Sequence, residues 1–263
     1  MALLASAVCD GAAQGLDFIA YQEAGFMLFT IFHSSVTLPS AIIAVALLRA
    51  KVTWTQWAGV LLVVVGLLVT VIPNPVKPKN SFLWGFTTSA VGSLCLAASY
   101  PFSEMVFQLG AAHRPSEEMA CFLGSVFNVV IFSVWTAVFT VPRWNEDVYQ
   151  PIINDKFYPS VPWAWASYLL YGLMVGLHSL SFWKSVYKLG TVPTAVSKGA
   201  QQAGCFIFAH IFFCHIDDKE CIDNNHGSGV WSRMQKGVAC LMCCLGVVVY
   251  ALGKRRGAPA GEE

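Results

Sequence analysis

The stretch GLDFIAYQEAGFMLFTIFHSSVTLPSAIIAVALL (Gly15–Leu48) has a later counterpart, LSFWKSVYKLGTVPTAVSKGAQQAGCFIFAHIFF (Leu180–Phe213). In both stretches an aromatic segment ends a helix, a tight turn reaches Gly25 or Gly190, and a long apolar helix follows. Recurrence of a pattern of this length indicates an internal repeat, and such repeats are typical of membrane carriers.

The composition predicts a protein that crosses the bilayer several times. Of the 263 residues, 56% are hydrophobic and 12% are charged, whereas soluble domains have about 25% charged residues. The net charge of +1 and the lack of a basic cluster interleaved with aromatic residues argue against nucleic acid as a partner. The bilayer is therefore the expected surrounding.

A membrane-spanning helix needs about 20 mostly apolar residues, and eight windows meet this requirement. Five of them carry no charge: Ala24–Leu48, Trp54–Ile72, Phe82–Ser103, Met119–Val141 and Pro162–Trp183. Three contain charged residues: Met1–Ala20 with Asp10 and Asp17, Thr191–Cys214 with Lys198, and Trp231–Leu252 with Arg233 and Lys236. We therefore expect an all-α membrane protein with eight transmembrane helices.

The repeat predicts how these helices are organised. Helices one to three echo helices six to eight, and the tryptophan-led segments extend the match: Trp54, Gly59 and Gly66 correspond to Trp231, Gly237 and Gly246. An offset of five helices inverts one copy relative to the other across the bilayer. The expected units are a partial first repeat of three helices (1–72), a second repeat of five (82–252) and a basic tail (253–263), so two further helices are expected upstream of Met1.

One polar stripe interrupts the apolar seventh helix. Four of its members follow helical spacing: Thr194, Lys198, Gln201 and Gln202. A charge at bilayer depth costs about 2.5–3.5 kcal/mol on insertion scales, so such a residue generally faces the bundle interior or a wet cavity. The stripe is therefore a candidate substrate-binding surface.

The matching helix of the first repeat carries its own polar stripe, with Thr30, His33 and Thr37 on one face. Aligning Gly25 with Gly190 places His33 opposite Lys198. Two alternatives remain open: these side chains form only interhelical hydrogen bonds, or His33 carries a proton, since histidine is the side chain best suited to proton exchange at neutral pH. Asp17 and Glu104 are candidates to neutralise Lys198.

Other chemistry is less well supported by the sequence. Cys214 and Cys221 bracket a short polar segment, and either a disulfide or two free thiols fits that spacing. The chain contains no HExxH, GxSxG or GxxxxGK[ST] motif, so we expect neither an enzyme nor a bound metal or other cofactor. The polar connections 142–162 and 215–230 are expected to be exposed loops on one side of the membrane.

Charge gives only weak information about orientation. Lys and Arg of the connections divide evenly between the two sides, while Lys254, Arg255 and Arg256 form a compact cluster. That cluster favours a cytoplasmic C-terminus. No signal in the tail distinguishes the Golgi or endoplasmic reticulum from the plasma membrane.

The arrangement in two inverted five-helix repeats resembles the drug/metabolite transporter superfamily. So does the junction between two successive helices, AIIAVALLRAKVTWTQWAGVLLVVVGLLV (Ala41–Val69). The EamA-type carriers of this superfamily and the nucleotide-sugar transporter-like members of solute carrier family 35 are the nearest groups. The resemblance spans the chain from the third family helix to the tenth. This chain departs from the pattern at the junction, where Arg49–Lys51 replaces a frequent acidic residue.

The resemblance implies a multi-pass transporter that moves small metabolites by alternating access. A buried cation at Lys198 favours an anionic substrate, such as a nucleotide sugar or another organic solute. The expected partners are this small molecule, the lipid bilayer and a second copy of the chain in a homodimer. The alternative is a truncated relative that does not transport and acts as a membrane scaffold.

Overall fold

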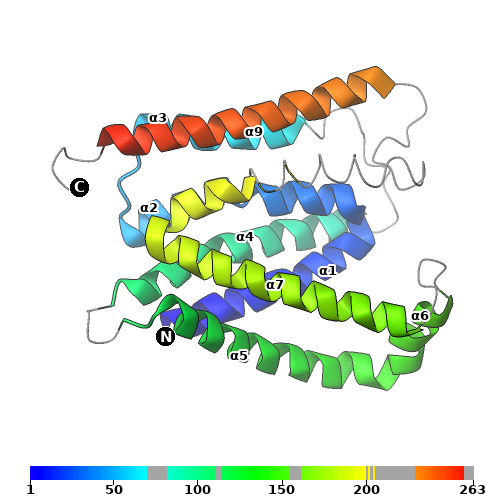
Figure 1. Ribbon diagram of the computed structural model, residues 1–263. Helices are drawn as coiled ribbons and strands as arrows, with labels where there is room; N and C mark the ends of the chain where they lie inside the picture. Colours follow the sequence, from blue (N-terminus) through cyan, green and yellow to red (C-terminus); the bar gives the residue numbers. More distant parts are fainter. Residues whose placement is uncertain are drawn as a thin grey trace. The chain divides into compact units, whose positions relative to one another are not determined.

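A computed structural model describes residues 1–69, 82–109, 114–154, 161–199, 201, 204 and 229–257. Every regular element in this described part is helical, as predicted (Figure 1). The main helices are α1 (Ala2–Ser35), α2 (Thr37–Leu48), α3 (Trp54–Val69), α4 (Phe82–Phe107), α5 (Glu117–Trp135), α6 (Gln150–Asn154), α7 (Val161–Leu189) and α9 (Gly229–Gly257). A further described helical segment covers 191–199.

Four helical stretches in the described part are long and apolar enough to cross a membrane: Ala2–Ala20, Leu83–Phe107, Glu117–Arg143 and Gly237–Lys254. They agree with four of the predicted windows. The helices α2 and α3 are apolar but shorter, with 12 and 16 residues. The described part of the chain is thus all-helical and contains four candidate membrane spans.

The helix α1 reverses direction although its backbone is helical throughout. On a straight helix the 16 residues from Asp17 to His33 would span about 24 Å. The Nδ1 atom of His33 nevertheless lies 3.1 Å from Oδ2 of Asp17. The chain must therefore turn back between these residues, and Figure 1 shows this bend in the blue helix. The predicted turn near Gly25 falls within this interval.

A second break separates α1 from α2 at Val36, inside the predicted helix Ala24–Leu48. Pro39 explains it, because proline has no N–H to donate to the carbonyl of Ser35 and its ring crowds that carbonyl. The hydroxyl of Ser35 donates to the carbonyl of Phe32 at 2.8 Å, and helical bonding resumes where Ser40 N donates to Val36 O at 2.9 Å.

The predicted loop 142–162 is largely helical in its described part. A π-helical turn (Thr136–Thr140), a 3₁₀ turn (Val141–Arg143) and a second π-helical turn (Asn145–Tyr149) lead into α6. This stretch has no glycine before 155, and Pro142 stands in the first turn of its 3₁₀ segment, where a missing N–H costs little. The loop prediction was therefore wrong over these residues.

The chain forms two compact units, Met1–Gly11 with Phe102–Lys188, and Ala12–Pro101 with Leu189–Glu263. In the first unit, α5 begins at an N-cap, because the hydroxyl of Ser116 accepts from Met119 N at 3.2 Å. Trp183 of α7 packs against Gly124 of α5, where an added Cβ would lie 3.2 Å from the indole ring. Phe107 completes this core in an edge-to-face contact with Trp183.

Most of α5 is left exposed within the first unit. Only 6% of the most apolar window in the stretch Glu117–Arg143, which begins with α5, is buried. Its exposed apolar side chains include Phe122, Val129 and Val134. A continuous exposed surface of this kind is unstable in water and stable against lipid. This agrees with an integral membrane protein.

The second unit is built on a close contact between α3 and α9. An added Cβ at Gly59 would lie 2.7 Å from both Gly246 O and Tyr250 N, and one at Gly66 would lie 3.0 Å from Ala239 O. Residue numbers therefore increase along α3 where they decrease along α9, so the two helices are antiparallel. Small residues let their backbones approach this closely.

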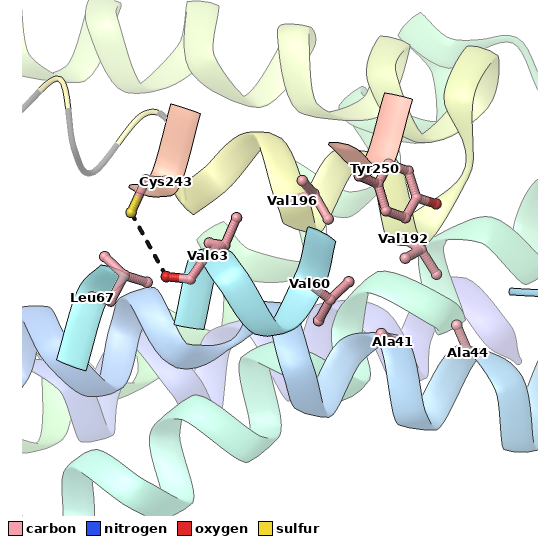
Figure 2. Close-up of a cluster of buried hydrophobic side chains, with 9 residues drawn as sticks. All are labelled: Ala41, Ala44, Val60, Val63, Leu67, Val192, Val196, Cys243 and Tyr250. Atoms are coloured by element: carbon pink, nitrogen blue, oxygen red, sulfur yellow. Dashed lines mark hydrogen bonds between the residues drawn. The ribbon is translucent and has the colours of Figure 1, made fainter. Parts of the chain in front are cut away.

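Around this contact lies the core of the second unit, drawn in Figure 2. The thiol of Cys243 donates to the carbonyl of Val63 at 3.7 Å, a weak bond for a sulfur donor. The members of the core come from α2, α3, the segment 191–199 and α9: Ala41, Ala44, Val60, Val63, Leu67, Val192, Val196, Cys243 and Tyr250. The antiparallel pair is thus fixed against α2 and 191–199 by packing.

Pro101 inside α4 leaves a backbone carbonyl without its helical donor, and a side chain of α2 donates a hydrogen bond to that carbonyl instead. Because proline has no N–H, the carbonyl of Ala97 four residues earlier loses its helical donor. The fully buried hydroxyl of Ser40 donates to that carbonyl at 3.2 Å. The hydroxyl of Thr191 donates to the neighbouring Tyr100 carbonyl at 3.2 Å. Two elements far apart in the sequence are thereby joined to α4.

We expect Ser40→Ala to destabilise the protein by about 1 kcal/mol, the cost of leaving a buried carbonyl unsatisfied. In a Pro101→Ala background the Ala97 carbonyl regains an N–H donor, so the same Ser40→Ala change should cost clearly less. Denaturant titration in detergent of the four proteins of this cycle measures the difference. An equal loss of stability in both backgrounds would mean that the Ser40 hydroxyl does not replace the missing donor to the Ala97 carbonyl.

Candidate functional site

The central feature of the second unit is an ionisable pair inside apolar helices. Nδ1 of His33 and Oδ2 of Asp17 are 3.1 Å apart, and their side chains are 18% and 12% exposed. The bend in α1 brings them together, because both belong to its apolar sequence. At this distance a shared hydrogen bond forms in either protonation state of the histidine, and an ion pair forms when the imidazole is protonated.

A glycine on α4 makes room for the carboxylate. An added Cβ at Gly92 would lie 2.9 Å from Oδ1 of Asp17 and 3.3 Å from Cβ of Leu16. Any larger residue at this position would displace the carboxylate or separate α4 from α1. The position of Asp17 is therefore determined by a close helix-to-helix approach.

Two buried hydroxyls on α4 flank this glycine. Ser89 is fully buried and Ser93 is 4% exposed, and neither hydroxyl oxygen has a hydrogen-bond partner among the described residues. They stand four residues apart and therefore on one face of the helix. Unsatisfied buried hydroxyls are costly, about 1–3 kcal/mol each, so they are candidates to hydrogen-bond water or a solute.

Thr37, a member of the first predicted stripe, contacts the helical segment that carries part of the second. Its fully buried hydroxyl donates to the carbonyl of Ala195 at 3.0 Å, which joins the start of α2 to the segment 191–199. Gly199 lies close by, because an added Cβ there would be 4.0 Å from Oγ1 of Thr37 and would overlap Cγ1 of Val63. Thr37 is thus structurally engaged at the contact that the sequence predicted as a substrate surface.

The remaining predicted residues differ in their surroundings. Thr194 is buried and donates its hydroxyl to the carbonyl of Gly190 at 2.8 Å, a bond within its own helix. Lys198 is half-buried, and Gln201 is exposed. Gln202, both cysteines of the candidate disulfide (Cys214 and Cys221) and the side chain of Thr30 lie outside the described residues.

The sequence does not predict how Asp17 is used. It makes Asp17 a candidate counterion for Lys198, whereas the carboxylate of Asp17 lies 3.1 Å from Nδ1 of His33. Gly92, Ser89 and Ser93 were also missed. A signal was present, since TTSAVGS (Thr87–Ser93) is a run of small and hydroxyl residues in an otherwise apolar helix.

The first unit has its own polar contact between apolar helices. The amide Nδ2 of Asn128 on α5 donates to Oδ2 of Asp10 on α1 at 3.0 Å, and the buried Oδ1 of Asn128 has no partner among the described residues. The hydroxyls of Ser6 and Ser103 lie 2.7 Å apart. The carboxylate of Asp10 is thus hydrogen-bonded by a neighbouring helix, whereas the hydrogen bond from His33 to Asp17 lies within α1.

These groups can bind protons and donate hydrogen bonds, and the described residues contain no group of three or more potential metal ligands. The Asp17 and His33 pair forms an ion pair when the imidazole is protonated. Carboxylate, imidazole and hydroxyl groups together suit the exchange of a proton or the binding of a polar solute.

Comparison with known proteins supports the fold. No protein-family model matches the chain, and no curated protein matches it by sequence. A solved crystal structure, of a protein described without an activity or ligand, is similar at a TM-score of 0.63 and 13% identity, covering 98% of this chain and 89% of its own. At this identity the likeness extends to the fold alone.

Proposed function

We propose that this protein is a multi-pass membrane transporter of small, anionic organic solutes. The observation that carries the proposal is the Asp17 and His33 pair, held at 3.1 Å and largely buried in an apolar helical hairpin. Ionisable residues inside membranes are expensive, and they mark substrate or ion pathways by default. A purely structural helix hairpin would be more stable with apolar residues at both positions.

The contact between α3 and α9 supports an inverted repeat. Gly66 and Gly246, matched in the sequence repeat, are 180 residues apart. The helices α3 and α9 that carry these matched glycines pack antiparallel, with Gly59 against Gly246 and Gly66 against Ala239. An inverted repeat requires this opposite direction of its matched helices.

Lys198 gives the proposal its substrate class. Lys198 is half-buried on the segment 191–199, and Ala195 of the same segment accepts a hydrogen bond from Thr37. A cation in such surroundings favours a solute that carries a carboxylate or phosphate. Thr194, Gln201, Gln202, Thr30 and Thr37 are proposed to supply hydrogen bonds near it. The resemblance to nucleotide-sugar carriers points to the same class of solute.

The proposed mechanism is alternating access. Two inverted repeats rock about a site near the bilayer midplane, which opens first to one side of the membrane and then to the other. Close contacts between small residues, as at Gly59 and Gly66, would let helices move as rigid pairs. The Asp17 and His33 pair would exchange a proton during the cycle.

Counterflow into proteoliposomes tests the proposal with a panel of anionic metabolites that includes nucleotide sugars, nucleoside monophosphates and dicarboxylates. We expect uptake of one class, reduced at least tenfold in Lys198→Ala. The matched control is Lys184→Ala, because Lys184 is an exposed lysine of α7 and its loss should leave uptake unchanged. Correctly folded protein without uptake of any solute would favour the membrane scaffold, and turnover without uptake would favour an enzyme.

A further inference from the structure

Basic residues from two distant parts of the sequence meet at one end of the second unit. Arg49 and Lys51 lie in the connection between α2 and α3, and Lys254 lies near the end of α9; all three are exposed. The antiparallel contact brings them together, because an added Cβ at Gly253 would lie 2.6 Å from Oγ1 of Thr55. In Figure 1 the red end of α9 lies beside the cyan connection into α3.

Neighbouring features mark this end as a membrane interface. Trp54, the first residue of α3, is 90% exposed, and exposed tryptophans at the ends of apolar helices are typical of the headgroup region. Lys254 also donates from Nζ to the carbonyl of Leu189 at 3.3 Å, which holds its charge at this same end. We define Arg49, Lys51, Trp54 and Lys254 as the basic end of the unit.

Few carboxylates are present in the described part of the second unit. Among the described residues of the second unit, the acidic side chains are Asp17 and Glu23, and both belong to α1. In the sequence, Arg255 and Arg256 follow Lys254 directly. A surface of this kind is complementary to a negatively charged partner.

The left-handed backbone conformation of Arg49 points to a binding role for its positive charge. Arg49 has φ 53° and ψ 34°, the left-handed conformation, and its N–H bonds to the carbonyl of Ala44. Glycine is the usual residue here, because a Cβ is disfavoured in this region. An arginine also interacts favourably with the C-terminal end of α2, but that interaction requires no particular backbone conformation. A strained arginine at a headgroup plane suggests a binding role.

We propose that the basic end binds the headgroup of an anionic phospholipid, with Arg49, Lys51 and Lys254 contacting its phosphate and Trp54 lying at the level of the headgroups. The location at a helix terminus and the absence of nearby described acids favour lipid over a soluble partner. This inference goes beyond transport, and it holds whether or not the protein carries a solute.

Native mass spectrometry of the purified full chain, titrated with phosphatidylserine and separately with phosphatidylcholine, tests the proposal. We expect selective retention of phosphatidylserine, weakened about fivefold for each basic residue removed and about a hundredfold in Arg49→Gln/Lys51→Gln/Lys254→Gln. Lys184→Gln is the control and should bind as the wild type does. Equal retention of both lipids would overturn the proposal.

Two further measurements exclude trivial explanations. Arg49→Gly removes the positive charge and also relieves the left-handed backbone, so lipid binding should weaken while Tm rises; a fall in both would mean that the variant merely unfolds and that Arg49 does not act as proposed. Inorganic phosphate should compete poorly with the lipid. Strong competition by phosphate would assign the basic end to a soluble anion and not to lipid.

Discussion

Gly59→Val is expected to destabilise the protein by about 3 kcal/mol, the upper range for overpacking a close contact. An added Cβ would lie 2.7 Å from backbone atoms of Gly246 and Tyr250, which cannot rotate away as a flexible side chain can. To relieve this steric overlap, α3 and α9 must separate, and their separation exposes the core around Val63. Chemical unfolding in detergent, followed by circular dichroism, measures the loss.

Gly237→Val is the matched control for this change. Gly237 is an exposed glycine of α9, and an added Cβ there would meet no atom within 4 Å. Its replacement should leave stability within about 0.5 kcal/mol of the wild type, as for most surface substitutions. If Gly59→Val and Gly237→Val behaved alike, the close antiparallel contact between α3 and α9 would be wrong.

The helices were predictable because a bilayer imposes a length and an apolar composition that can be read from the chain. Windows such as Phe82–Ser103 and Met119–Val141 match α4 and α5 to within a turn or two at the start, although both helical stretches run on. The break at Val36 divides the window Ala24–Leu48, which the sequence predicts as one helix. Whether a helix continues past a proline depends on nearby groups that can donate a hydrogen bond to the freed carbonyl, and the tertiary fold positions those groups.

The candidate site was predictable in part for a similar reason. Polar residues on an apolar helix, such as His33 and Lys198, stand out in the sequence. Their partners do not, because Asp17 reaches His33 only through a chain reversal, and Ser40 reaches Ala97 only because Pro101 removes a donor. Pairings between helices are set by packing, which spacing along one helix does not encode.

His33→Ala and Asp17→Asn should separate the stability of the pair from its function. Removing the imidazole leaves a buried carboxylate without its His33 partner, and we expect a cost of about 3 kcal/mol. Asp17→Asn keeps the shape and removes the charge, so it should cost less than about 1 kcal/mol. If the pair exchanges the proton of the transport cycle, both variants should lose solute uptake.

The double variant His33→Ala/Asp17→Asn provides the decisive comparison. Without a charge to bury it should be more stable than His33→Ala alone, which gives a coupling energy of about 2 kcal/mol in the double-mutant cycle, while uptake should remain absent. Unfolding in detergent and counterflow in proteoliposomes report the two quantities separately. Additive unfolding free energies would mean that the 3.1 Å contact is energetically unimportant. Full uptake by Asp17→Asn would show that no proton held by this carboxylate is needed, because the asparagine amide cannot take one up near neutral pH.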